Sequence, residues 1–112
     1  MRLRWRRIRL KVASVFRTAK AVRTDKETLW VRLEHDGIEG WGEAAPMDTY
    51  NQTLASAEQA LEAIASESKT WVGSAGLPPI ESITQDLLRR FDDQRATVAA
   101  IDSALHDWVG KR

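Results

Sequence analysis

The stretch ETLWVRLEHDGIEGWGEA, residues 27–44, holds the signals that decide the fold of this 112-residue chain. Every second residue from Leu29 to Leu33 is aliphatic, and this period-two alternation is typical of a half-buried strand. The Asp36-Gly37 pair that follows tolerates the positive φ of a tight hairpin turn. We therefore expect residues 38–44 to fold back as an antiparallel strand.

A further strand is expected before this hairpin. Its apolar residues alternate with basic ones, with one break in the alternation at Arg6-Arg7, and they are Leu3, Trp5, Ile8, Leu10 and Val12. This pattern predicts a strand over residues about 3–15 whose polar face is charged. Three strands in sequence order make an antiparallel meander.

After residue 53 the apolar period changes to that of helices. A first helix is expected from Thr53 onward, with an apolar stripe at Leu54, Ala57, Leu61, Ile64 and Ala65. Pro79 suits the start of a second helix, whose apolar face would be Ile80, Ile83, Leu87 and Phe91. A third helix is predicted over residues 94–109 with Gly110 as its C-terminal cap, and its apolar face would be Val98, Ile101, Leu105 and Trp108 or Val109.

This order of elements predicts an α+β fold, in which a three-stranded antiparallel meander (about 3–45) precedes a bundle of about three helices (about 53–110). A chain of 112 residues fits one domain. It has no run near the ~18 apolar residues of a transmembrane helix and no apolar core of a signal peptide. It also has no cysteine for a disulfide framework. We expect a cytoplasmic protein without membrane contact.

Charge is distributed unevenly along the chain. Nine basic and no acidic residues occur through Arg23, whereas the remainder has 8 basic and 16 acidic residues. A basic segment can bind nucleic acid or another polyanion. The alternation with apolar residues favours instead the solvated face of a strand, and no RNA-binding aromatic pair or zinc-ligand spacing accompanies it. Nucleic acid is therefore not the expected partner.

Residue patterns for catalysis are scarce. His35 and His106 are 71 positions apart and have no nucleophile arrangement beside them. Asp102 and His106 have the i, i+4 spacing of two metal ligands on a helix, but a third ligand is missing. The glycines between residues 37 and 42 do not match the phosphate-binding G-x-G-x-x-G spacing. We predict neither catalytic nor metal-binding residues in this chain.

Three motifs together resemble the N-terminal capping domain of the enolase superfamily. They are DGIEGWGEAAP on the third predicted strand, YNQT at the start of the first helix, and ATVAAIDSALHDWVGK at the end of the chain. Within the superfamily, the similarity is to the branch that contains muconate cycloisomerases and dipeptide epimerases. The segment FRTAKAVRT, residues 16–24, further resembles the mobile substrate loop of dipeptide epimerases, with Lys20 where many of them have arginine.

The resemblance implies that the chemistry belongs to a (β/α) barrel following the capping domain. There, lysines would remove and return a proton beside a carboxylate, and three acidic residues would bind Mg²⁺. Such a barrel needs about 200 residues or more, and the chain ends where it would begin. We expect a fragment, or a cap that finds its barrel elsewhere, which is inactive alone. It would self-associate through the apolar surface that a barrel would cover, with exchange of the first strand as one route.

The resemblance also implies a substrate-binding lid made of residues 16–25 and 45–53. Lys20 and Arg23 would pair with a carboxylate of a dipeptide or similar substrate, and the walls of its pocket would include Phe16 and Tyr50. The alternatives are solvated charges for the first pair and core or rim positions for the second. In a competing interpretation, residues 15–22 simply continue the first strand.

The same interpretation gives the glycine-rich strand a structural role. Gly40 and Gly42 would allow close approach to a neighbouring backbone or to Trp41, or they would serve sheet curvature alone. Glu43 would anchor the lid or be a surface acid. For function, the lid of a dipeptide epimerase is favoured. The alternatives are the cap of a muconate-type cycloisomerase and a free-standing module that binds a polyanion through its basic first strand.

Overall fold

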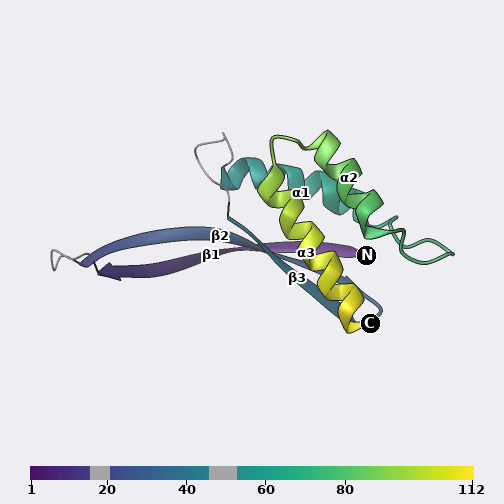
Figure 1. The fold of residues 1–112 in the computed structure, drawn as a ribbon, viewed down its shortest axis with the longest axis horizontal. Coiled ribbons are helices and arrows are strands. Elements are labelled where there is room, and N and C mark those ends of the chain that lie inside the picture. Colours follow the sequence, from purple (N-terminus) through teal and green to yellow (C-terminus); the bar gives the residue numbers. More distant parts are fainter. Residues whose placement is uncertain (16–20, 46–52) are drawn as a thin grey trace.

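The computed structural model describes residues 1–15, 21–45 and 53–112. Within these residues, strands come first and helices follow, in the order β1 (Arg2–Val15), β2 (Ala21–His35), β3 (Ile38–Ala44), α1 (Leu54–Ser68), α2 (Ile80–Arg90) and α3 (Arg95–Lys111). The predicted α+β class is confirmed. Figure 1 shows the helices gathered over one end of the sheet, while β1 and β2 continue past them.

The sheet is the predicted meander, with strand order β1-β2-β3 and antiparallel pairing throughout. His35 pairs with Ile38, so that only Asp36 and Gly37 form the turn between β2 and β3. Their φ angles are 54° and 73°. Positive φ at both central positions matches the twist of the flanking strands, which is why Asp-Gly is suited to this turn.

The core lies between one face of the sheet and the helices. Leu29, Val31 and Leu33 of β2 are fully buried, as the alternation predicted. They belong to one cluster with side chains of all three helices, including Ala57, Leu61, Ile64, Ile83, Leu87, Val98, Ile101, Leu105 and Trp108. The predicted helical stripes therefore form the core, although Val109 at the edge of the last stripe is exposed.

The contact between α3 and β3 is unusually close. A Cβ placed on Gly40 would lie 2.0 Å from the carbonyl oxygen of Ala104, and one placed on Gly42 would lie 2.0 Å from that of Ala100. No side chain can occupy that space, so glycine at both positions lets the two backbones touch. The predicted close approach of the third strand to a neighbouring backbone is confirmed, and the neighbour is α3.

The end of α3 differs from the prediction. Gly110 does not cap the helix, which continues to Lys111. The Lys111 ammonium donates to Asp107 Oδ2 at 2.8 Å and to the Glu39 carbonyl of β3 at 3.1 Å. These bonds hold the last turn in helical conformation, and they compensate for the low helix propensity of glycine.

The other two helices begin where the sequence predicted. Thr53 caps α1, because its hydroxyl accepts from the Ser56 N–H at 3.0 Å while Ser56 Oγ accepts from the Thr53 N–H at 2.9 Å. Pro79 occupies the position before α2. Within the described residues, no helix combines the length and the apolar character needed to cross a membrane.

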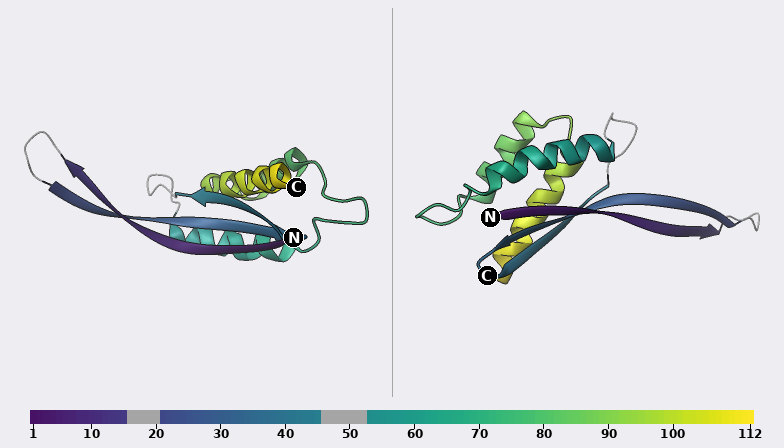
Figure 2. Two further views of the ribbon diagram at one scale, coloured as in Figure 1. Left: turned by 90° about the horizontal axis from the view of Figure 1, so that it is seen from below. Right: turned by 180° about the vertical axis from the view of Figure 1, so that it is seen from behind.

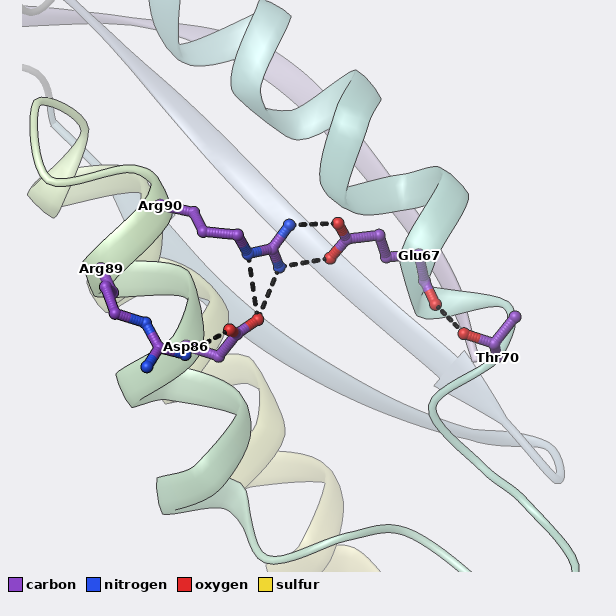
Figure 3. A network of polar contacts seen from close by, with 5 residues as sticks. All are labelled: Glu67, Thr70, Asp86, Arg89 and Arg90. Carbon is purple, nitrogen blue, oxygen red and sulfur yellow. Dashed lines mark hydrogen bonds and ion pairs between the residues drawn. The ribbon is translucent and has the colours of Figure 1, made fainter.

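Arginine 90 links the ends of α1 and α2 (Figure 3). Its guanidinium forms a bidentate ion pair with Glu67 of α1, and its Nε donates to Asp86 Oδ2 at 3.0 Å. Arg89 also binds Asp86, at 2.7 Å. The hydrogen bonds from Arg89 and Arg90 lower the pKa of Asp86, and Glu67 raises the pKa of Arg90. The network fixes the C-terminal end of α2 against the C-terminal end of α1, while α2 also packs on α3.

The close approach of α3 to β3 gives the first prediction. Gly42→Ala would force the two backbones apart, so we expect it to lower the free energy of unfolding by about 1–3 kcal/mol, the usual cost of overpacking. Urea denaturation followed by far-UV circular dichroism measures this. Gly73→Ala is the matched control, since a Cβ at that position meets nothing within 4 Å. Equal stability of the two variants would contradict the backbone contact.

Candidate functional site

Beyond the helices, β1 and β2 form a two-stranded arm that projects from the body of the molecule (Figure 2). The molecule consequently extends 60 Å along its longest axis and only 28 and 19 Å along the others. The register of the arm is regular, from Leu10 opposite Lys26 to Val15 opposite Ala21. Such a ribbon is a means of holding its far end well away from the core.

This ladder corrects the predicted lid boundaries. Residues 21–25 were expected to belong to a mobile loop, but they pair with residues 11–15 as part of β2. β-branched residues on both strands, such as Val12, Val22 and Thr24, favour this extended pairing. The competing interpretation, in which residues 15–22 continue the first strand, is also wrong, because β1 ends at Val15 and Ala21 begins a separate antiparallel strand.

The four predicted substrate-binding residues are placed only in part. Phe16, Lys20 and Tyr50 lie outside the described residues. The backbone of Arg23 pairs with Ala13 in the arm, near its far end, and its side chain is not among those described. The substrate-binding role of this set stays a prediction.

The base of the arm is tied to α1 by Glu58. The indole N–H of Trp5 donates to Glu58 Oε2 at 3.2 Å, and Arg7 Nε donates to Oε1 at 2.7 Å, with a second bond from the same guanidinium. Arg7 thus faces the helix side of the sheet, at the point where the sequence alternation breaks. Three donors converge on one carboxylate, and the arm leaves the body at a fixed point.

A second anchor joins the start of the arm to β3. Thr28 is buried, and its hydroxyl lies 3.0 Å from Glu43 Oε1 and 2.9 Å from the Ala44 carbonyl. Glu43 is itself exposed. It is thus a surface acid, as one of the two alternatives predicted, and it helps to fix the end of β3. Its role as an anchor of the lid stays a prediction.

The outer face of the sheet, opposite the helices, carries two exposed tryptophans. Trp30 and Trp41 are 43% and 42% exposed, and their rings meet edge to face with centroids 6.2 Å apart. The Arg32 guanidinium lies 5.8 Å from the centre of the Trp41 ring. A groove of about 370 Å³ runs beside them and is also lined by Arg4 and Arg6 of β1. This surface combines apolar rings with cations.

Sequence analysis missed both the Glu58 anchor and the outer face as sites. The break in alternation at Arg6-Arg7 was the available signal for the anchor, because it placed an arginine on the buried side of the sheet. The outer face could have been found from the hairpin register, since a two-residue turn at Asp36-Gly37 sets Trp41 opposite Arg32.

The paired histidine and aspartate of α3 serve the fold. Asp102 accepts a hydrogen bond from Thr84 of α2 at 2.8 Å, and His106 Nε2 lies 3.6 Å from the same Asp102 oxygen. In the part of the chain that the structure describes, no group of three histidine, aspartate or glutamate side chains is arranged to hold a metal ion.

Comparison with known families gives the class of this protein. The sequence profile described as "Mandelate racemase / muconate lactonizing enzyme, N-terminal domain" matches residues 6–112. The chain belongs to this family, the N-terminal domains of the enolase superfamily. A solved structure of a mandelate racemase/muconate lactonizing enzyme homologue from Sorangium cellulosum has the same fold, with a TM-score of 0.69 over 96% of this chain, at 21% sequence identity.

Two curated relatives are dipeptide epimerases. The "Hydrophobic dipeptide epimerase" of Flavobacteria bacterium (strain MS024-2A) is 29% identical over 112 residues, and the "L-Ala-D/L-Glu epimerase" of Bacteroides thetaiotaomicron is 31% identical over 106 residues. The matches cover 100% and 91% of this chain but only 30% and 25% of the relatives. The chain thus spans less than a third of the length of the relatives it matches.

The contact that holds Trp41 gives a prediction about pH. Asp107 Oδ2 accepts from Lys111 Nζ and from the Trp41 N–H at 2.9 Å, and these bonds lower the pKa of Asp107 below its usual value. The pKa of an aspartate in the unfolded chain is about 3.9. Because the folded-state pKa of Asp107 is lower, its ionised carboxylate stabilises the folded protein fully at pH values above the unfolded pKa. The contribution is lost as pH falls through the folded pKa.

We therefore expect Asp107→Asn to lower the free energy of unfolding at pH 7 and to have a smaller effect at pH 3. Urea denaturation at the two pH values measures the difference. Asp92→Asn is the matched control, because Asp92 lies exposed in the turn between α2 and α3 and no hydrogen bond involves its side chain within the described residues. An effect of Asp107→Asn that is independent of pH would contradict the assignment.

Proposed function

We propose that this chain is the substrate-lid, or capping, domain of a magnesium-dependent isomerase of the enolase superfamily that epimerises dipeptides. The observation that carries the proposal is the arm. It is a two-stranded ribbon tied at its base to Glu58, and its distal residues 21–24 belong to the segment 16–24 that resembles the substrate loop of dipeptide epimerases. A lid of this kind covers a reaction centre that another domain supplies.

In this proposal, a (β/α) barrel is the partner of the chain and performs the proton transfer next to the substrate carboxylate. Mg²⁺ bound by the barrel would stabilise the negative charge that develops on that carboxylate. The cap would exclude water from the site and supply specificity. Its own basic residues Lys20 and Arg23 would bind the dipeptide carboxylate that is not reacting.

The names of the two curated relatives support a dipeptide rather than a muconate substrate, since both describe dipeptide epimerases. The motif of the arm supports the same choice, because FRTAKAVRT resembles their substrate loop. The cap of a muconate-type cycloisomerase is the second candidate, and the name of the family favours it. Assay of both substrate classes distinguishes the two.

Because the proposed reaction needs both the cap and the barrel, the proposal predicts the activity of the cap alone. The 112-residue chain alone should show no turnover of dipeptides or muconate, with or without Mg²⁺, because the paired bases of this mechanism are expected in the barrel. A chimaera in which this chain replaces the cap of the Flavobacteria dipeptide epimerase should epimerise dipeptides. Proton exchange at the α-carbon, followed by NMR in D₂O, measures both. Turnover by the chain alone, or a folded chimaera that is inactive on every dipeptide, would contradict the proposal.

The predicted carboxylate clamp is tested in the same chimaera. Lys20→Ala should raise KM roughly tenfold, since one hydrogen bond to a charged group contributes about 1.5 kcal/mol. It should leave kcat almost unchanged, because a clamp away from the reacting carbon binds ground and transition states equally. Lys69→Ala is the matched control, since Lys69 is exposed at the end of α1. Equal kinetics of the two variants would remove Lys20 from the site.

A further inference from the structure

The side of β1 that faces the helices changes character along the strand. Leu3 is buried and Trp5 is half-buried against the core, whereas Arg7 and Arg9, the next two residues on that side, are exposed. Among the described side chains of β1, apolar packing on the helices therefore ends at Trp5. The arm begins where this packing stops.

Glu58 of α1 holds the strand at that point. Its carboxylate accepts the indole N–H of Trp5 at 3.2 Å and two N–H groups of the Arg7 guanidinium, of which Nε lies at 2.7 Å. The Glu58 side chain is only 28% exposed, so water and salt screen these bonds less than those of a fully exposed ion pair. One carboxylate thus joins α1 to two successive residues on the helix-facing side of β1.

The next ion pair along the arm has a different role. Arg9 binds Glu27 at 2.9 Å, and the two residues lie directly opposite each other on β1 and β2. This pair joins the strands of the ribbon to one another, but it cannot by itself set the direction of the ribbon relative to the helices. The bonds of Glu58 can, because they connect the ribbon to α1.

We propose that Glu58 is a positioning residue, whose carboxylate fixes the angle at which the arm leaves the helical body and thereby the place where the arm would meet a substrate. A two-stranded ribbon is a weak structure alone, so its direction depends on the contacts at its base. Glu58 would act through the arm and not on the substrate itself. The effect on substrate binding rests on the proposed function, whereas the effect on the angle depends only on the bonds to β1.

The length of the arm makes a small change at its base important. From Arg9 to Val15, β1 advances by about 20 Å at the usual rise of a strand. A tilt of about 10° at the base would therefore move the end of β1 by roughly 3–4 Å, far more than the spread of hydrogen-bond lengths. Because a misplacement of about 1 Å can already cost an enzyme about a hundredfold in rate, a lid on such an arm needs a fixed base.

The angle of the arm can be measured in the 112-residue chain, whose lack of cysteine allows spin labels at two chosen positions. Labels at Ser14→Cys in the arm and at Ala63→Cys on the exposed side of α1 give a distance distribution by double electron–electron resonance. Glu58→Ala should widen this distribution by roughly 3–4 Å, the displacement that a tilt of about 10° produces. Glu58→Gln keeps one acceptor for Arg7 without the charge, so it should widen the distribution less. Glu62→Ala is the matched control, since Glu62 is exposed one turn later on α1 and no hydrogen bond involves its side chain within the described residues.

Kinetics in the chimaera test the consequence for the substrate. If Glu58→Ala leaves the arm in place for about a tenth of the time, KM for dipeptides should rise roughly tenfold, with a smaller change in kcat. Glu62→Ala should leave both constants unchanged.

Circular dichroism confirms that each variant is folded, and Glu58→Gln decides the test if Glu58→Ala unfolds. A folded Glu58 variant with the distance distribution of the wild type would overturn the proposal. A widened distribution in a chimaera whose KM stays that of Glu62→Ala would overturn it too, because the angle of the arm would then not affect the substrate. An inactive parent chimaera would contradict the proposed function alone, and the distance distribution would then decide the role of Glu58.

Discussion

The contact of α3 with β3 is the constraint on which the rest of the structure depends. Because Gly40 and Gly42 have no side chain, the carbonyls of Ala100 and Ala104 lie directly on the strand. β2 lies between β3 and β1, so fixing β3 on α3 also fixes the buried row of β2 and the strand beyond it. The direction in which the arm leaves the body is thus set by packing at the opposite edge of the sheet.

The parts of the fold that the sequence predicted correctly are those that depend on the backbone preferences of neighbouring residues. The Asp36-Gly37 turn, the cap at Thr53 and the proline at 79 each determine a boundary through their own backbone preferences, and each was placed correctly. Long-range contacts explain what was missed. The extension of β2 back to Ala21 depends on pairing with β1, and the Glu58 anchor joins segments about fifty positions apart. No periodicity within a single segment contains that information.

The uneven distribution of charge has a structural explanation. Among the basic residues of β1, Arg7 and Arg9 are paired within the chain, whereas Arg2, Arg4 and Arg6 face outward without a described partner. The basic segment therefore divides between residues that hold the base of the arm and exposed residues on the outer face of the sheet. The substrate role proposed for residues 16–24 is separate from both, since β1 and β2 run well past the helices before β1 ends at Val15 (Figure 1).

The central claim is that the arm carries a substrate lid. A crystal structure of the chimaera with a bound dipeptide tests it most directly. We expect the arm to lie over the mouth of the barrel, with Lys20 Nζ within about 3.2 Å of a dipeptide carboxylate. An arm that points into solvent while the dipeptide is bound and turned over would contradict it.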